Sequence, residues 1–139
     1  MKQMLYRLIE EGINKDNETV FKELLADDFE SHGFHVAAGP NGYSDITKQF
    51  KILLPNFKVI IKDTVIEGNK IASRGTVSGT HTGQFSDITP TGKQVSFPYM
   101  DLWRVENGKF VEGWTVLDVL KLLQELGLVA LPESEFPQD

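Results

Sequence analysis

The stretch that decides the fold is Tyr99–Gly127, which reads YMDLWRVENGKFVEGWTVLDVLKLLQELG. In its first part Tyr99, Asp101 and Trp103 are spaced by two, so on an extended segment their side chains share one face. A turn and a second strand follow, and the stretch ends in a leucine-rich helix that begins after Asp118. The pattern predicts a carboxylate held between two large aromatic rings on one wall of a sheet.

The turn between the two strands sets which residue lies opposite Asp101. A three-residue loop, Glu106–Gly108 with its glycine in the left-handed position, would place Gly113 opposite Asp101 and Thr115 opposite Tyr99. That arrangement would leave room for a small apolar cavity with one polar group. A two-residue turn, Asn107–Gly108, would slip the pairing by one residue and place Trp114 opposite Asp101.

Length and composition limit the class of protein. With 139 residues, 40% of them hydrophobic, we expect a single domain over residues 1–131 and an acidic tail at 132–139. The formal net charge of −6 argues against a nucleic-acid partner, and the lack of cysteine excludes disulfides and thiolate metal sites. No apolar run approaches the roughly 20 residues that span a bilayer, and the start lacks a signal-peptide core. We therefore expect a cytoplasmic protein without a membrane partner.

The chain before Tyr99 changes from helical to strand periodicity at Pro55. Apolar residues at helical spacing predict amphipathic helices over Met4–Asn14, from a cap at Asn17 to the stop at Asp27-Asp28, and over about Tyr43–Leu54. Phe29–Phe34 is too short and too aromatic for another helix. Alternation with period two predicts strands over Phe57–Val65 and Lys70–His81. Three helices, an antiparallel meander and a closing helix are typical of an α+β fold with helices on one face of a curved sheet.

Asp101 is the leading candidate for chemistry. Between Tyr99 and Trp103 its carboxyl would lose solvent, which raises a carboxyl pKa toward the range of a general acid or base. The alternative is an ordinary strand aspartate, paired with a cation or exposed to water. His32, which follows the aromatic Phe29, is the histidine that we expect to assist with proton transfer at the pocket mouth.

The three histidines do not predict a metal site. His32 and His35 are three positions apart and would point to opposite faces of a strand, and His81 precedes a loop. The chain contains no nucleophile elbow, phosphate-binding loop or dinucleotide fingerprint. We therefore expect neither a metal nor a cofactor.

Residues out of phase with Asp101 should form the other face of the same strands. Arg104 and Glu112 are expected to pair there across the strands. So much apolar surface around an ion pair predicts a covered face, and a second subunit is the favoured cover because the helices occupy the opposite side. The apolar residues of this expected dimer interface are Met100, Leu102, Phe110 and Trp114.

Taken together, several short features from about Met4 to Leu128 resemble the SnoaL-like polyketide cyclases, an ester and polyketide cyclase family of the NTF2-like superfamily. These features occur in the family's order: Asp28-Phe29 with His32, Gly79-Thr80-His81, Pro90-Thr91-Gly92-Lys93, Arg104, Gly108-Lys109, Glu112, Trp114, Asp118 and Gln124–Gly127. The resemblance implies an NTF2-like cone, with helices packed on a strongly curved antiparallel sheet around an apolar cavity and with subunits often paired through the sheet. It also implies intramolecular aldol ring closure by an aspartate helped by histidines, without metal or cofactor.

The family's catalytic pair does not carry over to this chain. Its aspartate, in a His-x-Asp arrangement on the last strand, falls at Thr115, and its histidine falls at Gly113. Because these family positions face the cavity, the resemblance favours the three-residue turn. Asp101 would then take the acid/base role from the neighbouring strand.

These observations lead to one main hypothesis about function and two alternatives. The main one is a cofactor-independent cyclase or isomerase that acts on a small aromatic or polyketide-like carbonyl compound. One alternative is a homodimer that binds a small apolar ligand without reacting, and a weaker one is hydration or epoxide opening. With Asp101 and His32 as catalytic groups, the expected substrate contacts are Tyr99, Trp103, Thr115, Phe50 and Phe29.

Overall fold

A computed structural model describes residues 1–33, 37–84 and 87–129; the tail predicted at 132–139 and His35 lie outside these ranges. The elements in chain order are α1 (Lys2–Arg7), the π-helix η1 (Leu8–Ile13), α2 (Glu18–Leu24), β1 (Leu25–His32), α3 (Pro40–Leu53), β2 (Lys58–Glu67), β3 (Lys70–Thr80), β4 (Gln94–Glu106), β5 (Lys109–Leu117) and α4 (Val119–Glu125). None of the described helices is both long enough and apolar enough to cross a bilayer.

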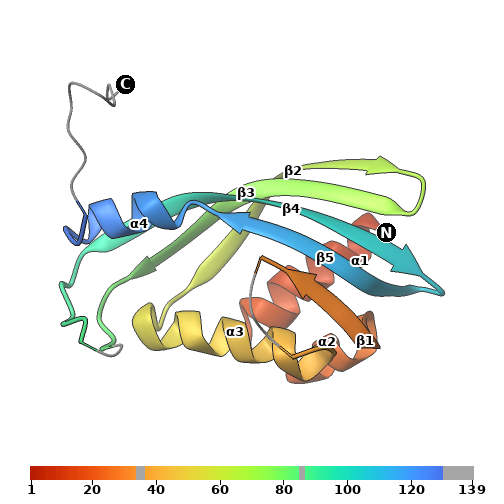
Figure 1. Ribbon diagram of the computed structural model, residues 1–139, viewed down its shortest axis with the longest axis horizontal. Coiled ribbons are helices and arrows are strands. Elements are labelled where there is room, and N and C mark those ends of the chain that lie inside the picture. Colours follow the sequence, from red (N-terminus) through yellow and green to blue (C-terminus); the bar gives the residue numbers. More distant parts are fainter. Residues whose placement is uncertain (34–36, 85–86, 130–139) are drawn as a thin grey trace.

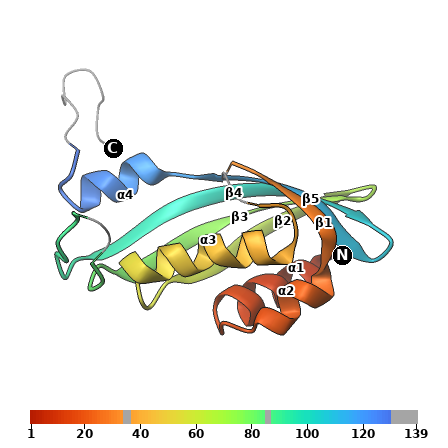
Figure 2. The same cartoon turned by 60° about the horizontal axis from the view of Figure 1, so that its bottom comes forward.

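The five strands form one sheet in the order β1-β5-β4-β3-β2. Strands β2 to β5 are an antiparallel meander, as predicted, but β1 joins β5 in the parallel direction, so the sheet is mixed, with β1 and β2 as its edge strands. Figures 1 and 2 show α1, α2 and α3 on one face of the curved sheet and α4 beyond the end of β5. The predicted α+β architecture with helices on one face is therefore confirmed, and the wholly antiparallel sheet is corrected.

Strand β1 is the element that the sequence pattern did not predict. Its Leu25, which was expected in the buried stripe of the second helix, already has an extended backbone, with φ −100° and ψ 138°. Leu25 and Phe29 are buried in the core, and Glu30 lies opposite Glu112 of β5. Because that partner strand lies some 80 residues further along the chain, pairing in the folded sheet, rather than local periodicity, makes this segment a strand.

The turn between β4 and β5 differs from both sequence-based alternatives. It is the two-residue turn Asn107–Gly108, with φ of 51° and 77°, but Val111 is then left unpaired as a β-bulge. The extra residue shifts the pairing, so that Asp101 lies opposite Thr115 rather than Gly113 or Trp114. The predicted three-residue turn is therefore wrong, although Asp101 and Thr115 share one face as expected.

The bulge also moves Phe110 to the inner face. Phe110 is fully buried, and its ring centroid lies 5.1 Å from that of Trp103. Its predicted place in a dimer interface on the outer face is therefore wrong, because residues before and after a bulge alternate in opposite phase. Beyond the bulge, Glu112 faces outward as predicted and pairs with Arg104, with 3.1 Å between Nε and Oε1.

Candidate functional site

A cavity of about 50 Å³ lies between the helices and the inner face of the sheet, with room for roughly three or four water molecules. It is apolar except for a few hydroxyls and one carboxyl, that of Asp101. No positively charged side chain occurs among the described residues that line it, which are Ile9, Ile13, Tyr43, Ile46, Thr47, Phe50, Phe57, Val59, Val77, Tyr99, Asp101, Thr115 and Leu117.

Asp101 is 8% exposed, and its Oδ1 accepts a hydrogen bond from the Ser73 hydroxyl on the neighbouring strand β3. Ser73 and Asp101 are directly opposite in the register of β3 and β4. Loss of solvent raises the pKa of Asp101 to about 6, and the Ser73 hydroxyl and the nearby Trp103 indole partly oppose this rise. A carboxyl with a pKa of about 6 can give and take protons near neutral pH.

Two tyrosines stand beside this carboxyl. Tyr43 of α3 and Tyr99 of β4 both line the cavity, and both are nearly buried. Burial raises the pKa of Tyr43 well above its usual range and that of Tyr99 to about 12, and the charge on Asp101 adds to both effects. Both hydroxyls therefore stay protonated at neutral pH and can donate hydrogen bonds.

Two of the expected substrate contacts lie behind the cavity rather than in its wall. Trp103 and Phe29 are stacked on each other, with 5.8 Å between ring centroids, and both are about 1% exposed. Gly113 makes this stack possible, since a Cβ at that position would lie 3.0 Å from Trp103 and 3.1 Å from Phe29. These aromatic rings therefore occupy the space beside Gly113 that the sequence analysis assigned to a cavity. The other expected contacts, Tyr99, Thr115 and Phe50, belong to the cavity wall.

His32 lies on the outer face of the sheet, away from Asp101. Its Nε2 is 2.7 Å from Oε2 of Glu112, and its ring stacks on Trp114 with 5.1 Å between centroids. The predicted partnership between His32 and Asp101 is therefore wrong, because odd positions on β4 face inward whereas His32 joins the outward side chains of β5. The hydrogen bond from His32, followed by that from Arg104, holds the pKa of Glu112 below its usual range.

The same outer cluster is the group of described residues whose donor atoms could approach a cation. The potential ligand atoms of Glu30, His32 and Glu112 lie within 4.8 Å of one another. His32 and Arg104 already contact Glu112 in this cluster, at 2.7 Å and 3.1 Å, and Arg104 supplies a positive charge. The arrangement is thus accounted for as an ion-pair network on the sheet surface.

Sequence reasoning missed Tyr43 and Ser73. Tyr43 could have been found from helical spacing, since Tyr43, Ile46, Thr47 and Phe50 follow one face of α3 and all line the cavity. Ser73 could not, because its position opposite Asp101 depends on the register between β3 and β4, and the long connection over 81–93 does not fix that register.

An apolar groove adjoins the cavity along α3. It has a volume of about 190 Å³ and is lined by Ile46, Gln49, Phe50 and Leu53. Ile46 and Phe50 are walls of both hollows. A compound with a small polar head in the cavity could thus lay an apolar extension along α3.

Comparisons with solved structures show the same fold in several bacterial proteins. TsrD from Streptomyces laurentii superposes with a TM-score of 0.82 at 23% identity, covering 92% of this chain and 95% of that one. IdmH from Streptomyces antibioticus, provisionally described as a polyketide cyclase, gives 0.80 at 25% identity, with 91% and 97% covered. AclR from Streptomyces galilaeus, provisionally described as a hydroxylase, gives 0.81 at 23% identity, with 96% and 85% covered.

Sequence comparison identifies the family. A search of curated proteins gave no match. The family model for SnoaL-like polyketide cyclases matches residues 3–126, which is most of the chain and includes every helix and strand described above except the first residue of α1. This chain therefore belongs to the SnoaL-like polyketide cyclase family, and its fold is the NTF2-like fold of the structures it resembles.

Proposed function

We propose that this protein catalyses cofactor-independent acid/base chemistry on a small carbonyl compound, such as an intramolecular aldol cyclisation or a related isomerisation. The observation that carries the proposal is the Asp101 carboxyl, 8% exposed in an apolar cavity, with its pKa raised to about 6 by loss of solvent. A desolvated carboxylate of this kind is a stronger base than an exposed one.

The proposed reaction moves one proton and forms one carbon–carbon bond. Asp101 takes a proton from the carbon next to a carbonyl group, and the electron pair of that C–H bond passes to the carbonyl oxygen, giving an enolate. The enolate carbon then attacks a second carbonyl of the same molecule. Asp101 returns the proton to the new alkoxide, so the product is an isomer of the substrate and nothing else is consumed.

The register of the sheet supports Asp101 in this role. The position at which the family's aspartate is expected is Thr115, and Asp101 lies directly opposite Thr115 on the adjacent strand. Both residues line the same cavity. Adjacent strands lie about 4.8 Å apart, so an acid at residue 101 enters the cavity one strand away from the expected place.

A second candidate function is capture of a small apolar ligand without reaction. Gly113 and Thr115, at the positions of the family's His-x-Asp pair, favour it, because neither side chain can move a proton as that pair does. The two functions differ in whether the bound compound exchanges its acidic protons with solvent.

Proton exchange in heavy water tests the proposal without knowledge of the natural substrate. Phenylacetone and acetylacetone are incubated with the protein, and loss of the signal from the protons next to their carbonyl groups is followed by NMR. We expect the protein to accelerate exchange of at least one ketone and Asp101→Asn to reduce that acceleration about a hundredfold or more. The rate should rise with pH through about 6, as Asp101 loses its proton.

A matched control substitutes an aspartate outside the cavity. Asp63 lies on β2 with its side chain 59% exposed and paired with Arg74, so Asp63→Asn should leave exchange unchanged. Equal exchange with the wild-type protein and Asp101→Asn would show that Asp101 is not the base. Binding of both ketones without accelerated exchange would favour the second candidate function.

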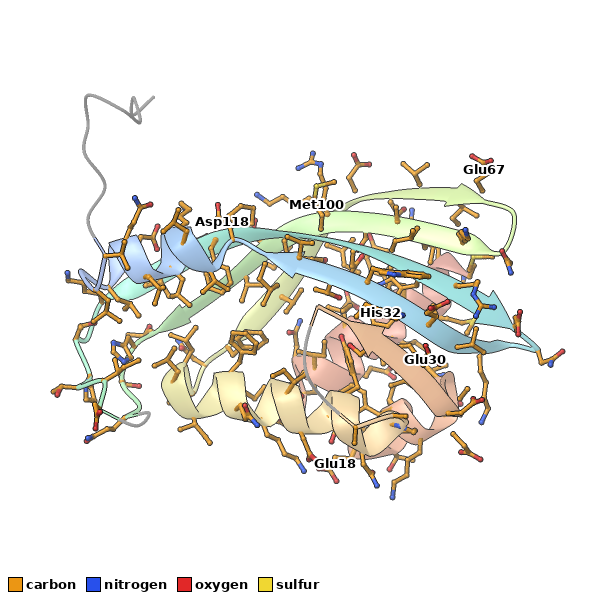
Figure 3. All side chains as sticks on the ribbon, in the orientation of Figure 1. Glu18, Glu30, His32, Glu67, Met100 and Asp118 are labelled. Carbon is orange, nitrogen blue, oxygen red and sulfur yellow. The ribbon has the colours of Figure 1, made fainter. Side chains whose placement is uncertain are left out.

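We also propose that two copies pair through the outer face of the sheet. Met100 is 63% exposed and lies opposite Val116, which is 72% exposed, and Leu102 lies beside them opposite Trp114. Figure 3 shows Met100 projecting from the sheet on the side away from α3. An apolar patch of this kind on adjacent strands is typical of an interaction surface.

A further inference from the structure

The cavity wall contains two tyrosine side chains, those of Tyr43 and Tyr99. The Tyr99 hydroxyl is buried and makes no hydrogen bond of normal geometry, although the Ser73 hydroxyl lies near enough to lower the pKa of Tyr99. Tyr43 is 6% exposed and lies within electrostatic reach of Asp101 and Tyr99. Both residues line the cavity beside Asp101. Buried hydroxyls are normally paired because an unpaired one destabilises the fold, so the Tyr99 hydroxyl, with a second tyrosine beside it in the cavity wall, points to a ligand atom as its partner.

Other unpaired groups in the described ranges do not share this position. The remaining buried polar atoms without a partner are Nε2 of His81 and Nε1 of Trp103, and neither residue lines the cavity. The Trp103 indole instead lies near the Asp101 carboxyl and helps to restrain its pKa. The two tyrosines are therefore the aromatic donors beside Asp101 that are available to a molecule in the cavity.

The charges around the cavity limit what that molecule can be. The negative charge on Asp101 acts on both Tyr43 and Tyr99, which places the three groups within electrostatic reach of one another. Since no cationic side chain occurs among the described lining residues, a carboxylate or phosphate would meet Asp101 without compensation. A neutral carbonyl compound avoids this repulsion, because its oxygen becomes negative only as Asp101 is neutralised by the proton it removes.

We infer that the hydroxyls of Tyr43 and Tyr99 bind the oxygen of a neutral ketone or ester while Asp101 removes a proton from the adjacent carbon. This inference rests on the proposed function for the proton transfer and adds to it the substrate class and the two donors. The C–H bond breaks, an O–H bond forms on Asp101, and the electron pair becomes the double bond of an enolate whose oxygen carries the charge. The cavity holds one negative charge before and after the step, and the two O–H groups stabilise it in its second location.

The rings of both tyrosines are held so that their hydroxyls are preorganised. The Tyr43 ring meets Phe29 and Trp103 edge to face, at centroid distances of 5.9 Å and 5.7 Å. The Tyr99 ring lies over Gly75, where an added Cβ would be 2.8 Å from its Cε1. Fixed donors stabilise a developing charge more than mobile ones do, because they need not reorient during the reaction.

Substitution by phenylalanine removes each hydroxyl and keeps each ring. Tyr43→Phe and Tyr99→Phe are each expected to lower the rate of phenylacetone exchange at least tenfold, and the double variant further. Tyr6→Phe, which removes the hydroxyl of a partly exposed tyrosine on α1 outside the cavity lining, is the matched control and should have little effect. The melting temperatures of the two single variants should stay within a few degrees of wild type, because each variant keeps its ring and the Tyr99 hydroxyl makes no hydrogen bond of normal geometry. Unchanged exchange in both variants, or a fall of several degrees in both melting temperatures, would overturn the inference.

A binding measurement separates this inference from the proposed function. In the Asp101→Asn background the cavity keeps its tyrosines and has no acid, and the probe is para-nitrophenol, whose absorbance reports ionisation of its hydroxyl. We expect Asp101→Asn to bind the ionised form, and addition of both tyrosine substitutions to weaken that binding at least tenfold. Failure of Asp101→Asn to bind the ion, or equal binding after removal of both hydroxyls, would refute the oxygen site. If Asp101→Asn binds the ion through its tyrosines but the wild-type protein shows no exchange activity, the oxygen site formed by the two hydroxyls is supported and the proposed function is refuted.

Discussion

The buried carboxyl of Asp101 should make the stability of the protein fall as pH rises. An ordinary aspartate has a pKa of 3.8, and burial raises that of Asp101 to about 6. Each unit of pKa difference corresponds to about 1.4 kcal/mol, so the difference amounts to about 3 kcal/mol. The folded state binds this proton more tightly than the unfolded state does. The free energy of unfolding therefore declines between about pH 4 and about pH 6, and the full loss is present above that range.

Asp101→Asn removes this proton and should remove its pH dependence. Asparagine has nearly the same shape and can still accept a hydrogen bond from Ser73. The variant should therefore gain stability relative to the wild-type protein as pH rises, by about 3 kcal/mol between about pH 4 and about pH 8. Groups such as Glu18 and Glu23, whose pKa values are lowered by Lys48 and Arg7, are present in both proteins and cancel in the difference.

Urea unfolding followed by tryptophan fluorescence measures this difference, since Trp103 is buried beside Asp101 and will be exposed on unfolding. The two proteins are compared at several pH values, with the exposed Asp63→Asn as control, for which the difference from wild type should stay nearly constant. The reasoning is refuted if the free energies of unfolding of Asp101→Asn and wild type differ by the same amount at about pH 4 and about pH 8. Asp101 would then be hydrated in the folded state, and neither its raised pKa nor its role as a base would stand.

Three further substitutions test the arrangement of the sheet. Trp114→Glu should convert a dimer to monomer in sedimentation velocity because it places a charge in the outer apolar patch; a dimer of unchanged affinity would exclude that patch as the contact. Gly113→Ala should lower the free energy of unfolding by about 1–3 kcal/mol, since the added methyl group would lie 3.0 Å from Trp103 and 3.1 Å from Phe29. An unchanged urea midpoint would show that the two stacked rings can move apart without loss of stability. Phe110→Ala should lower the free energy of unfolding by about 3–5 kcal/mol, because the Phe110 side chain is fully buried. A loss of less than about 1 kcal/mol would indicate that Phe110 is not buried and instead lies on the outer face.

The parts of the fold that could be predicted from the sequence are those encoded by local periodicity. The helix α3 was expected over Tyr43–Leu54 and spans Pro40–Leu53, and the strand β3 was expected over Lys70–His81 and ends one residue earlier. The predicted helix cap at Asp118 is also confirmed, since its Oδ1 accepts a hydrogen bond from the backbone N–H of Lys121. In each case neighbouring residues carry the information.

The parts that could not be predicted depend on pairing between distant segments. Strand β1 has too few alternating residues to be recognised alone, and it exists because β5 offers it a free edge. The position of His32 follows from that pairing, which sets it opposite Trp114 on the outer face. Proximity in the sequence to the aromatic Phe29 therefore gave the wrong side of the sheet for His32, because successive strand residues alternate between faces.

The bulge at Val111 explains why a two-residue turn is compatible with a cavity at Asp101. Without the extra residue, Asn107–Gly108 would set Trp114 opposite Asp101, and the indole would turn inward into the space where Thr115 now lies. With Val111 as the extra residue, the even-numbered Phe110 packs in the core near the turn. Beyond the bulge, the odd-numbered Gly113 and Thr115 face inward. The single unpaired residue therefore lets β5 contribute Phe110 to the aromatic core near the turn and Thr115 to the cavity wall opposite Asp101. The alternation that the sequence displays on β4 is therefore insufficient to locate the site, because the opposite wall depends on a phase change within β5.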